Sequence, residues 1–259
     1  MNASSYSIEK IKASLVPVAS EAELYVFESI DSTNSYAKTL AHSKNKKNAV
    51  VIANGQTGGR GTRGRSFISN EGKGLYISIL FYPEKGVTPA DITIYAAVKA
   101  AESVEAMSPL SVKIKWVNDL YVNERKLAGI LTEGEIQASA LEYAVVGIGI
   151  NTHGYTLAPD IADIATTVER ECNVEISREA LAIELINRFF SSLDKLGTEQ
   201  TLNEYRNRSL LTGRTVRIIS AEGDFNAKVV EILDTGAILI EKENGEQKEL
   251  ISADVSLRI

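Results

Sequence analysis

Runs of apolar residues alternate with segments of helical periodicity over most of the chain. Short apolar runs typical of buried strands occupy residues 24–27, 50–53, 75–81, 112–116, 126–131 and 144–150. Thr88 and Pro89 form a helix start, after which apolar residues recur every three or four positions until Pro109. A second apolar stripe, with residues spaced by four, begins near Ser177. This alternation predicts an α+β domain in which helices cover a sheet.

The pattern changes after Gly213. Short β-rich runs follow at residues 216–219, 227–233, 237–241, 248–251 and 255–259, separated by glycine-containing turns. They predict a small all-β barrel or sandwich. We therefore divide the chain into a larger domain of residues 1–211 and a smaller one of residues 212–259.

The composition excludes several classes of function. The 259 residues are 44% hydrophobic and 24% charged, and their net charge of -6 argues against a general nucleic-acid binder, which needs a basic face. The one cysteine, Cys172, cannot form an internal disulfide, and neither His42 nor His153 has the neighbours of a structural zinc site. No leader and no bilayer-spanning stretch is visible, so we expect a cytoplasmic protein that does not bind membranes.

Residues 56–65, here called the arginine loop, hold four glycines and three arginines between two predicted strands. Glycine keeps such a loop mobile and lets its backbone approach a ligand closely. The planar fork of arginine matches the oxygens of phosphate or carboxylate. A solvated turn explains this density of both residue types poorly, so the arginine loop predicts binding of an anionic substrate.

Four further segments carry polar residues at the ends of predicted strands. Residues 31–34 precede a predicted helix, and residues 113–121 run from a strand into a turn. Lys126 opens a strand that contains Gly129, and residues 147–151 end another strand with two glycines and an asparagine. Each of these features also has a simpler explanation when taken alone. Residues 31–34 fit an N-cap, Lys126 fits an exposed lysine at a hairpin edge, and the glycines of residues 147–151 fit close strand packing.

In this order, the motifs DSTN, QTxGRGxxGR, KWxNDLY, RKLAGIL and GIGIN resemble the biotin protein ligase family. The resemblance extends from Phe27 to Ile259. It implies a catalytic domain related to class II aminoacyl-tRNA synthetases and an SH3-like C-terminal barrel. It also implies an enzyme that activates biotin with ATP to biotinyl-5'-AMP and transfers biotin to a lysine of a biotin carboxyl carrier domain.

The same resemblance implies roles for individual residues. Lys126 and Arg60 would be catalytic, by stabilising the charges of carboxylate and phosphate. Biotin would be bound by Ser32, Thr33, Asn34, Gln56, Arg60, Gly61, Thr62, Lys126, Gly129 and Gly147. ATP or the adenylate would be bound by Arg60, Arg63, Arg65, Phe67, Lys115, Asn118, Asp119, Lys126 and Asn151. Mg²⁺ would be held mainly through the ATP phosphates, and no protein ligand for it is identified.

This chain departs from the commonest family pattern at three positions. Thr62 stands where many relatives have arginine, Phe67 replaces a tryptophan, and Val117 replaces a proline. Loss of the arginine removes a two-pronged phosphate contact, and the sequence does not tell whether Arg63 replaces it. Retention of the adenylate is therefore an open question, and loose retention would label lysines of bystander proteins.

Alternatives remain open at this point. A lipoate or octanoate ligase of the same fold would favour an apolar pocket, whereas Ser32, Thr33 and Gln56 suit a polar ureido group. An RNA-binding module is disfavoured by the net negative charge of the chain and by the lack of aromatic residues among the basic ones.

Only about two dozen residues precede the first strand, too few for the helix-turn-helix domain of some relatives, so we expect no operator binding. The chain would act as a monomer or weak homodimer.

Overall fold

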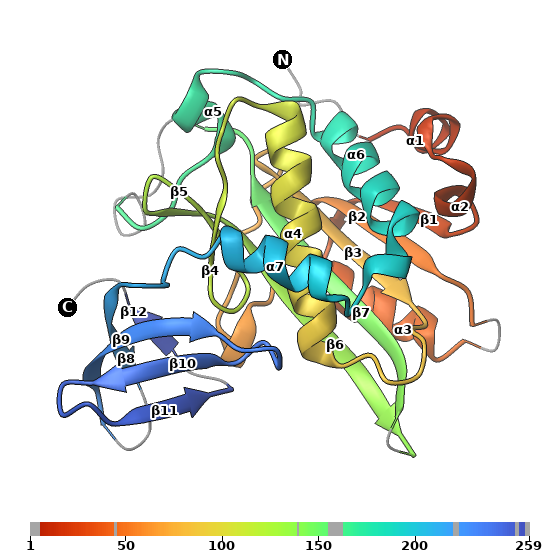
Figure 1. Ribbon diagram of the computed structural model, residues 1–259. Coiled ribbons are helices and arrows are strands. Elements are labelled where there is room, and N and C mark those ends of the chain that lie inside the picture. Colours follow the sequence, from red (N-terminus) through yellow and green to blue (C-terminus); the bar gives the residue numbers. More distant parts are fainter. Residues whose placement is uncertain are drawn as a thin grey trace.

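The computed structural model describes residues 6–43, 46–138, 140–154, 163–219, 223–251 and 254–256. Its larger part is a seven-stranded sheet in the order β1-β2-β3-β7-β6-β5-β4 (Figure 1). Its strands are β1 (Glu23–Ile30), β2 (Ala49–Gln56), β3 (Gly74–Phe81), β4 (Lys113–Lys115), β5 (Asp119–Val122), β6 (Arg125–Gln137) and β7 (Ala140–Asn151). Only β1 and β2 pair in parallel. The predicted strands are confirmed, and β5 is an addition to them.

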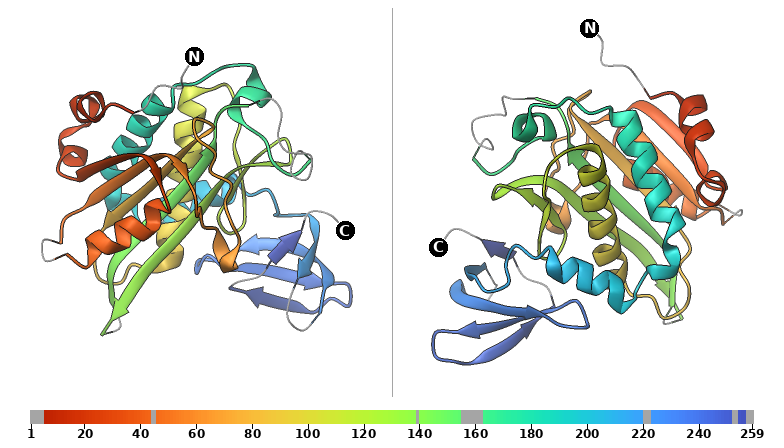
Figure 2. Two further views of the ribbon diagram at one scale, coloured as in Figure 1. Left: turned by 180° about the vertical axis from the view of Figure 1, so that it is seen from behind. Right: turned by 45° about the horizontal axis from the view of Figure 1, so that its top comes forward.

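Helices cover both faces of this sheet (Figures 1 and 2). Helices α4 (Pro89–Met107) and α6 (Arg178–Ser191) lie on one face, with α7 (Glu199–Asn207) packed against α4, and α3 (Thr33–Ala41) lies on the other. The strands alternate accordingly: Val50 and Ile52 enter the core beneath α4, while Val51 and Leu80 pack beneath α3. The mixed α+β fold is therefore confirmed.

The predicted helix starts are confirmed by their hydrogen bonds. The side chain of Thr88 accepts from the backbone of Asp91, whose carboxylate in turn accepts from the backbone of Thr88, as in a capping box. Ser177 caps α6 by accepting from the backbone N–H of Ala180. Helix α6 ends at Ser191, so Leu193, which continues the spacing by four in the sequence, lies outside it in the separate 3-10 turn η2 (Leu193–Lys195).

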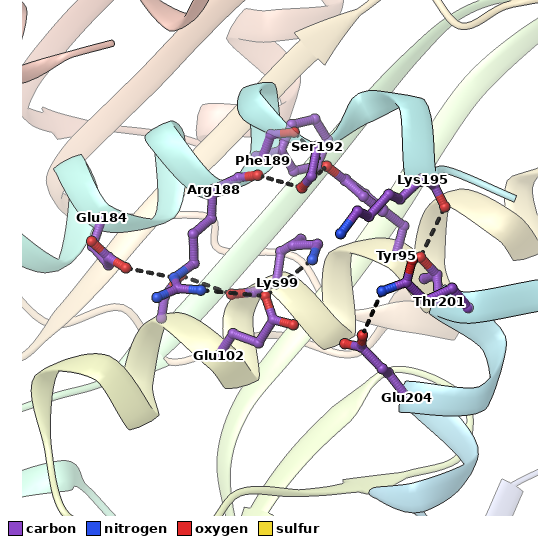
Figure 3. Close-up of polar contacts among 12 residues, drawn as sticks. Tyr95, Lys99, Glu102, Glu184, Arg188, Phe189, Ser192, Lys195, Thr201 and Glu204 are labelled. Atoms are coloured by element: carbon purple, nitrogen blue, oxygen red, sulfur yellow. Dashed lines mark hydrogen bonds and ion pairs between the residues drawn. The ribbon is translucent and has the colours of Figure 1, made fainter. Parts of the chain in front are cut away.

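A buried polar cluster joins the helices on the α4 face (Figure 3). Lys99 of α4 is only 7% exposed, and its ammonium donates to Glu102 at 3.0 Å. Arg188 of α6 approaches the same carboxylate at 3.6 Å. Burial works against ionisation of Glu102, but hydrogen bonds with Glu204 and Lys99 lower the pKa of its carboxyl. The cluster therefore links α4, α6 and α7 electrostatically.

The first residues of the chain pack against α6 as two short helices, α1 (Ile8–Ser14) and α2 (Pro17–Ser20). The guanidinium of Arg178 lies 5.1 Å from the centre of the Tyr6 ring and donates to Asn54 at 2.8 Å. Asn187 of α6 accepts from the backbone of Val16 at 2.9 Å. These contacts attach the N-terminal segment to the rest of the larger part.

The C-terminal part is a five-stranded antiparallel sheet in the order β11-β10-β9-β8-β12. Its strands are β8 (Thr215–Ile219), β9 (Phe225–Ile232), β10 (Ile238–Lys242), β11 (Gln247–Leu250) and β12 (Asp254–Ser256). Among the described residues, no strand pairing closes this sheet into the predicted barrel. The last part of the predicted strand, residues 257–259, lies outside the described residues. The domain boundary at residue 211 stays a prediction.

Several polar contacts fix the C-terminal sheet to the larger part. The indole N–H of Trp116 donates to the carbonyl of Gly236 at 2.9 Å, and Arg214 pairs with Glu124 at 2.6 Å. A side chain at Gly236 would meet Ile94 of α4, so the turn before β10 sits directly on that helix. The sheet is thereby held beside the β5–β6 hairpin.

Candidate active site

A cavity of about 600 Å³ lies on the α3 face of the sheet. The arginine loop, the start of α3, the β5–β6 hairpin and the C-terminal sheet surround it. Most predicted site residues line it: Ser32, Thr33, Asn34, Gln56, Arg60, Gly61, Thr62, Arg65, Phe67, Lys115, Asn118, Asp119, Lys126, Gly129 and Gly147. Arg60 and Lys126, which are far apart in the sequence, thus meet at one cavity.

Glycines make the floor of this cavity. Gly147 and Gly149 of β7 are on the same face of the strand as Val145, which packs beneath α3. A Cβ on Gly147 would overlap the side-chain oxygen of Asn34, and one on Gly149 would come within 2.5 Å of the Phe67 ring. Any larger residue at either position would therefore displace a wall of the cavity.

One end of the cavity is polar. Ser32 is the N-cap of α3, and Gln56 Oε1 accepts from the backbone N–H of Thr33 at 2.8 Å and from its hydroxyl at 3.0 Å. Gln56 Nε2 donates to Ser69 Oγ at 2.9 Å. Ser69 and the buried Ser78 were not predicted. These hydroxyl and amide groups suit a ligand with both hydrogen-bond donors and acceptors.

The polar atoms of Asn34 are already used within the protein. Its Oδ1 accepts from the hydroxyl of Ser78 at 2.6 Å, and its Nδ2 donates to the carbonyl of Leu131 at 3.4 Å and to Glu133 at 2.9 Å. Asn34 therefore shapes the wall beside Gly147, and direct binding of biotin by its amide stays a prediction.

The arginine loop is folded back on itself. Gly61 donates to the carbonyl of Arg65 at 2.7 Å, and Arg60 and Ser66 form a β-bridge on either side of the 3-10 turn η1 (Thr62–Gly64). The Phe67 ring that follows packs over Gly129 and Gly149. The side chain of Arg63 lies outside the described residues. The loop thus has a defined base on the cavity floor.

Lys126 lies beside the Phe67 ring, near the start of β6. Its ammonium pairs with Asp119 of β5 at 2.7 Å and is 33% exposed. The turn between these strands has Asn123 and Glu124 at positive φ, as a two-residue type I′ hairpin requires. The side chain of Asn118 donates to the carbonyl of Ile130 at 2.6 Å and braces the same strands. The β5–β6 hairpin therefore presents a partly buried cation to the cavity.

A second segment, residues 163–167, runs beside Lys126. The backbone N–H of Lys126 donates to the carbonyl of Ile164, and the backbone carbonyl of Lys126 accepts from the N–H of Thr166, both at 2.9 Å. Asn151 is not among the cavity-lining residues, because its amide donates to the carbonyl of Thr166 at 3.1 Å. Asn151 thus supports this segment, and its predicted proximity to the nucleotide stays untested.

Glu171 of α5 (Val168–Cys172) anchors this segment and was not predicted. Its carboxylate is 2% exposed and accepts from Arg125 and Asn123, each at 2.7 Å, and from the hydroxyl of Thr166. Burial opposes its ionisation, but these hydrogen bonds and the charge of Arg125 lower the pKa of Glu171 below its ordinary value.

We expect Glu171→Gln to lower the free energy of unfolding at neutral pH by about 2 kcal/mol, the size of a charge-assisted hydrogen bond. Because the folded pKa is lowered, this stability exists above the ordinary glutamate pKa of about 4.3 and is lost as the pH falls through the folded pKa. Urea unfolding of both proteins at several pH values should show the difference shrinking toward acid. A difference independent of pH would contradict this role.

The C-terminal sheet also contributes to the cavity, which the sequence did not indicate. Ile219 of β8 and Val255 of β12 line it, as does Tyr121 of β5.

Within the described part of the chain, no three His, Cys, Asp or Glu side chains form a metal-binding group. Among those same residues, no helix is both long and apolar enough to span a bilayer.

Residues 26–151 match the biotin/lipoate A/B protein ligase family, and residues 211–258 match the biotin protein ligase C-terminal domain. The bifunctional ligase/repressor BirA of Bacillus spizizenii is 30% identical over 235 residues, which cover 88% of this chain and 72% of that protein. The biotin–[acetyl-CoA-carboxylase] ligase of Paracoccus denitrificans is 28% identical over 84% of this chain and 93% of that protein. The structure of the Aquifex aeolicus biotin protein ligase with biotin and ATP superposes with a TM-score of 0.77 at 27% identity, covering 90% of this chain and 97% of that one.

Proposed function

The chain belongs to the biotin/lipoate A/B protein ligase family, and on that premise we propose that it is an ATP-dependent biotin protein ligase. It activates biotin to biotinyl-5'-AMP and then transfers biotin to a lysine of an acceptor protein. The observation that carries this is the single cavity in which Arg60 and Lys126 flank a glycine floor with a polar end. The acceptor in this proposal is a biotin carboxyl carrier domain, and the name of the Paracoccus denitrificans relative, which mentions acetyl-CoA carboxylase, supports an acceptor of that kind.

The first step brings two anions together. The carboxylate of biotin attacks the α-phosphate of ATP, the bond from that phosphorus to the bridging oxygen breaks, and pyrophosphate leaves. Lys126 and Arg60 stabilise the charge that builds up between carboxylate and phosphate, and one such preorganised donor is worth about 3–4 kcal/mol at a transition state. Asp119 holds the Lys126 ammonium in place through its 2.7 Å ion pair.

The second step needs no covalent enzyme intermediate. The amine of the acceptor lysine attacks the acyl carbon of the adenylate, and AMP leaves with the electron pair of the broken C–O bond. The mixed anhydride hydrolyses in water, so walls that exclude water have a chemical purpose. Phe67, Ile219 and Val255 supply apolar walls for this.

Mg²⁺ would be held mainly through the ATP phosphates in this proposal. Asp119 is already paired with Lys126, so the described residues do not form an all-protein magnesium site. When bound, the ion neutralises phosphate charge. The roles of Ser32, Thr33 and Gln56 toward the ureido group, and of Lys115 and Asn118 toward the nucleotide, are part of this proposal.

Biotin should be preferred to lipoate, because the hydroxyl and amide groups at the polar end of the cavity can form further hydrogen bonds with a ureido group but not with the apolar ring of lipoate. We expect ATP–pyrophosphate exchange to be at least about a hundredfold faster with biotin, measured as kcat/KM. Equal exchange with lipoate would favour a lipoate ligase of the same family. The family match leaves the RNA-binding interpretation without support.

Several expectations stay predictions. They are a monomer or weak homodimer, the absence of operator binding and a cytoplasmic location. Whether Thr62 loosens retention of the adenylate stays an open question. Thr62 does line the cavity, at the first position of η1, where a longer cationic side chain would reach a phosphate.

A further inference from the structure

Glu133 of β6 lies where three elements of the site meet. Its carboxylate accepts from Lys38 of α3 at 2.7 Å and from Asn34 at 2.9 Å, and it lies 3.7 Å from the guanidinium of Arg60. Together with Arg60 it lines a second hollow of about 610 Å³ on the other side of the arginine loop. Glu133 thus connects α3, the sheet and the loop.

The three contacts of Glu133 differ in strength. Burial opposes ionisation of this carboxyl, but the hydrogen bonds from Lys38 and Asn34 lower its pKa, so it is ionised at neutral pH. Lys38 makes the short contact and compensates most of this charge. Arg60 makes the long contact and is half exposed. The guanidinium is therefore directed toward Glu133 on one edge, while its other N–H groups stay available to a ligand.

The glycine-rich backbone of the arginine loop does not by itself fix the position of the Arg60 side chain. Glycines at 58, 59, 61 and 64 surround Arg60 in the chain and give the loop many alternative conformations. Ordering a long arginine side chain during ligand binding costs conformational entropy. Among the described residues, Glu133 is the ion-pair partner of Arg60. An Arg60 ordered in advance would spare the ligand that cost.

Resting on the function proposed above, we propose that Glu133 is a positioning residue, which holds the Arg60 guanidinium at the cavity wall before the carboxylate of biotin arrives. Arg60 then meets this carboxylate, and later the phosphate, without a separate ordering step. The ammonium of Lys38 continues to balance the negative charge of Glu133 when Arg60 turns toward the ligand.

The test uses Glu133→Gln in the full chain. The glutamine keeps one of the two oxygens, so it still accepts from Lys38 or Asn34, which donate to different oxygens of Glu133, and it lacks the charge that attracts Arg60. Equilibrium dialysis would measure the Kd of biotin and of biotinamide, which has no carboxylate. Glu142→Gln is the matched control: Glu142 is a carboxylate on β7 that pairs with Lys46 at 2.9 Å, has comparable exposure and lines neither cavity.

We expect Glu133→Gln to weaken biotin binding about threefold to fivefold, as for a partly exposed ion pair, and to leave biotinamide binding unchanged. In an Arg60→Met background, the same change should alter the biotin Kd by less than about 1.5-fold, because the partner is gone. Glu142→Gln should match the unaltered protein throughout.

Three results would overturn the proposal. Equal weakening of biotin and biotinamide would mean that Glu133 only maintains the shape of the slot. Unchanged binding of both would mean that it does not order Arg60. Tighter biotin binding would mean that the negative charge of Glu133 only repels the carboxylate of biotin. Failure of the unaltered protein to bind biotin would instead count against the proposed function itself.

Discussion

Replacing Lys126 with alanine is expected to slow biotinyl-adenylate formation by about 10²–10³-fold while leaving the fold intact. The ammonium is the cation that the β5–β6 hairpin presents to the cavity, and Asp119 fixes it at 2.7 Å. Removing one preorganised donor from a site that stabilises developing charge lowers kcat by about 10²–10³-fold. ATP–pyrophosphate exchange measures this loss directly, since it reports the first step alone.

The fold should tolerate this substitution because the ion pair is partly exposed and contributes only about 1 kcal/mol. Lys113→Ala is the matched control, since Lys113 is an exposed lysine in the neighbouring strand β4 and does not line the cavity. Thermal unfolding of all three proteins would separate lost chemistry from lost structure. An exchange rate for Lys126→Ala within tenfold of the unaltered enzyme would remove Lys126 from the mechanism.

Replacing Gly147 with alanine is expected to weaken biotin binding at least about a hundredfold, the usual consequence of moving a binding group by roughly 1 Å. The new methyl group would overlap Asn34, whose amide is held by Ser78, Leu131 and Glu133 and cannot turn away without breaking these bonds. The start of α3 must move instead, and with it Thr33 at the polar end. Calorimetric titration with biotin would measure the effect.

Val146→Ala separates this effect from simple destabilisation. Val146 is the neighbouring residue in β7, points into the core beneath α4 and does not line the cavity. Its truncation should cost about 2 kcal/mol of stability through lost packing, yet it should leave the biotin affinity within about twofold. Biotin binding by Gly147→Ala that equals binding by Val146→Ala would show that the glycine has no special role.

The sequence predicts those parts of the fold in which local pattern and tertiary burial agree. The alternating strands and the capped starts of α4 and α6 are such cases, because their apolar positions are both regular and buried. Helix α7 was not predicted as a separate helix, because it is strongly polar and its buried residues are Thr201, Leu202 and Tyr205. Strand β5 was missed because it has four residues and follows a turn closely.

The sequence motifs predicted residues that line the cavity. They did not predict the residues that hold those side chains in place. Glu133 and Glu171 act through contacts with segments distant in the sequence, such as Lys38 and Arg125. A carboxylate on a strand or a short helix has no local signal that distinguishes such a contact from solvent exposure. The cavity wall from Ile219 and Val255 depends on how two sheets are placed, which no spacing within either sheet determines.

Mass spectrometry of a quenched reaction of the purified chain with biotin and MgATP tests the central claim most directly. If Arg60 and Lys126 bring carboxylate and phosphate together in one cavity, biotinyl-5'-AMP and pyrophosphate should form in equal amounts, and Lys126→Ala should form both about 10²–10³-fold more slowly. Absence of biotinyl-5'-AMP from a folded, biotin-binding protein would contradict the account.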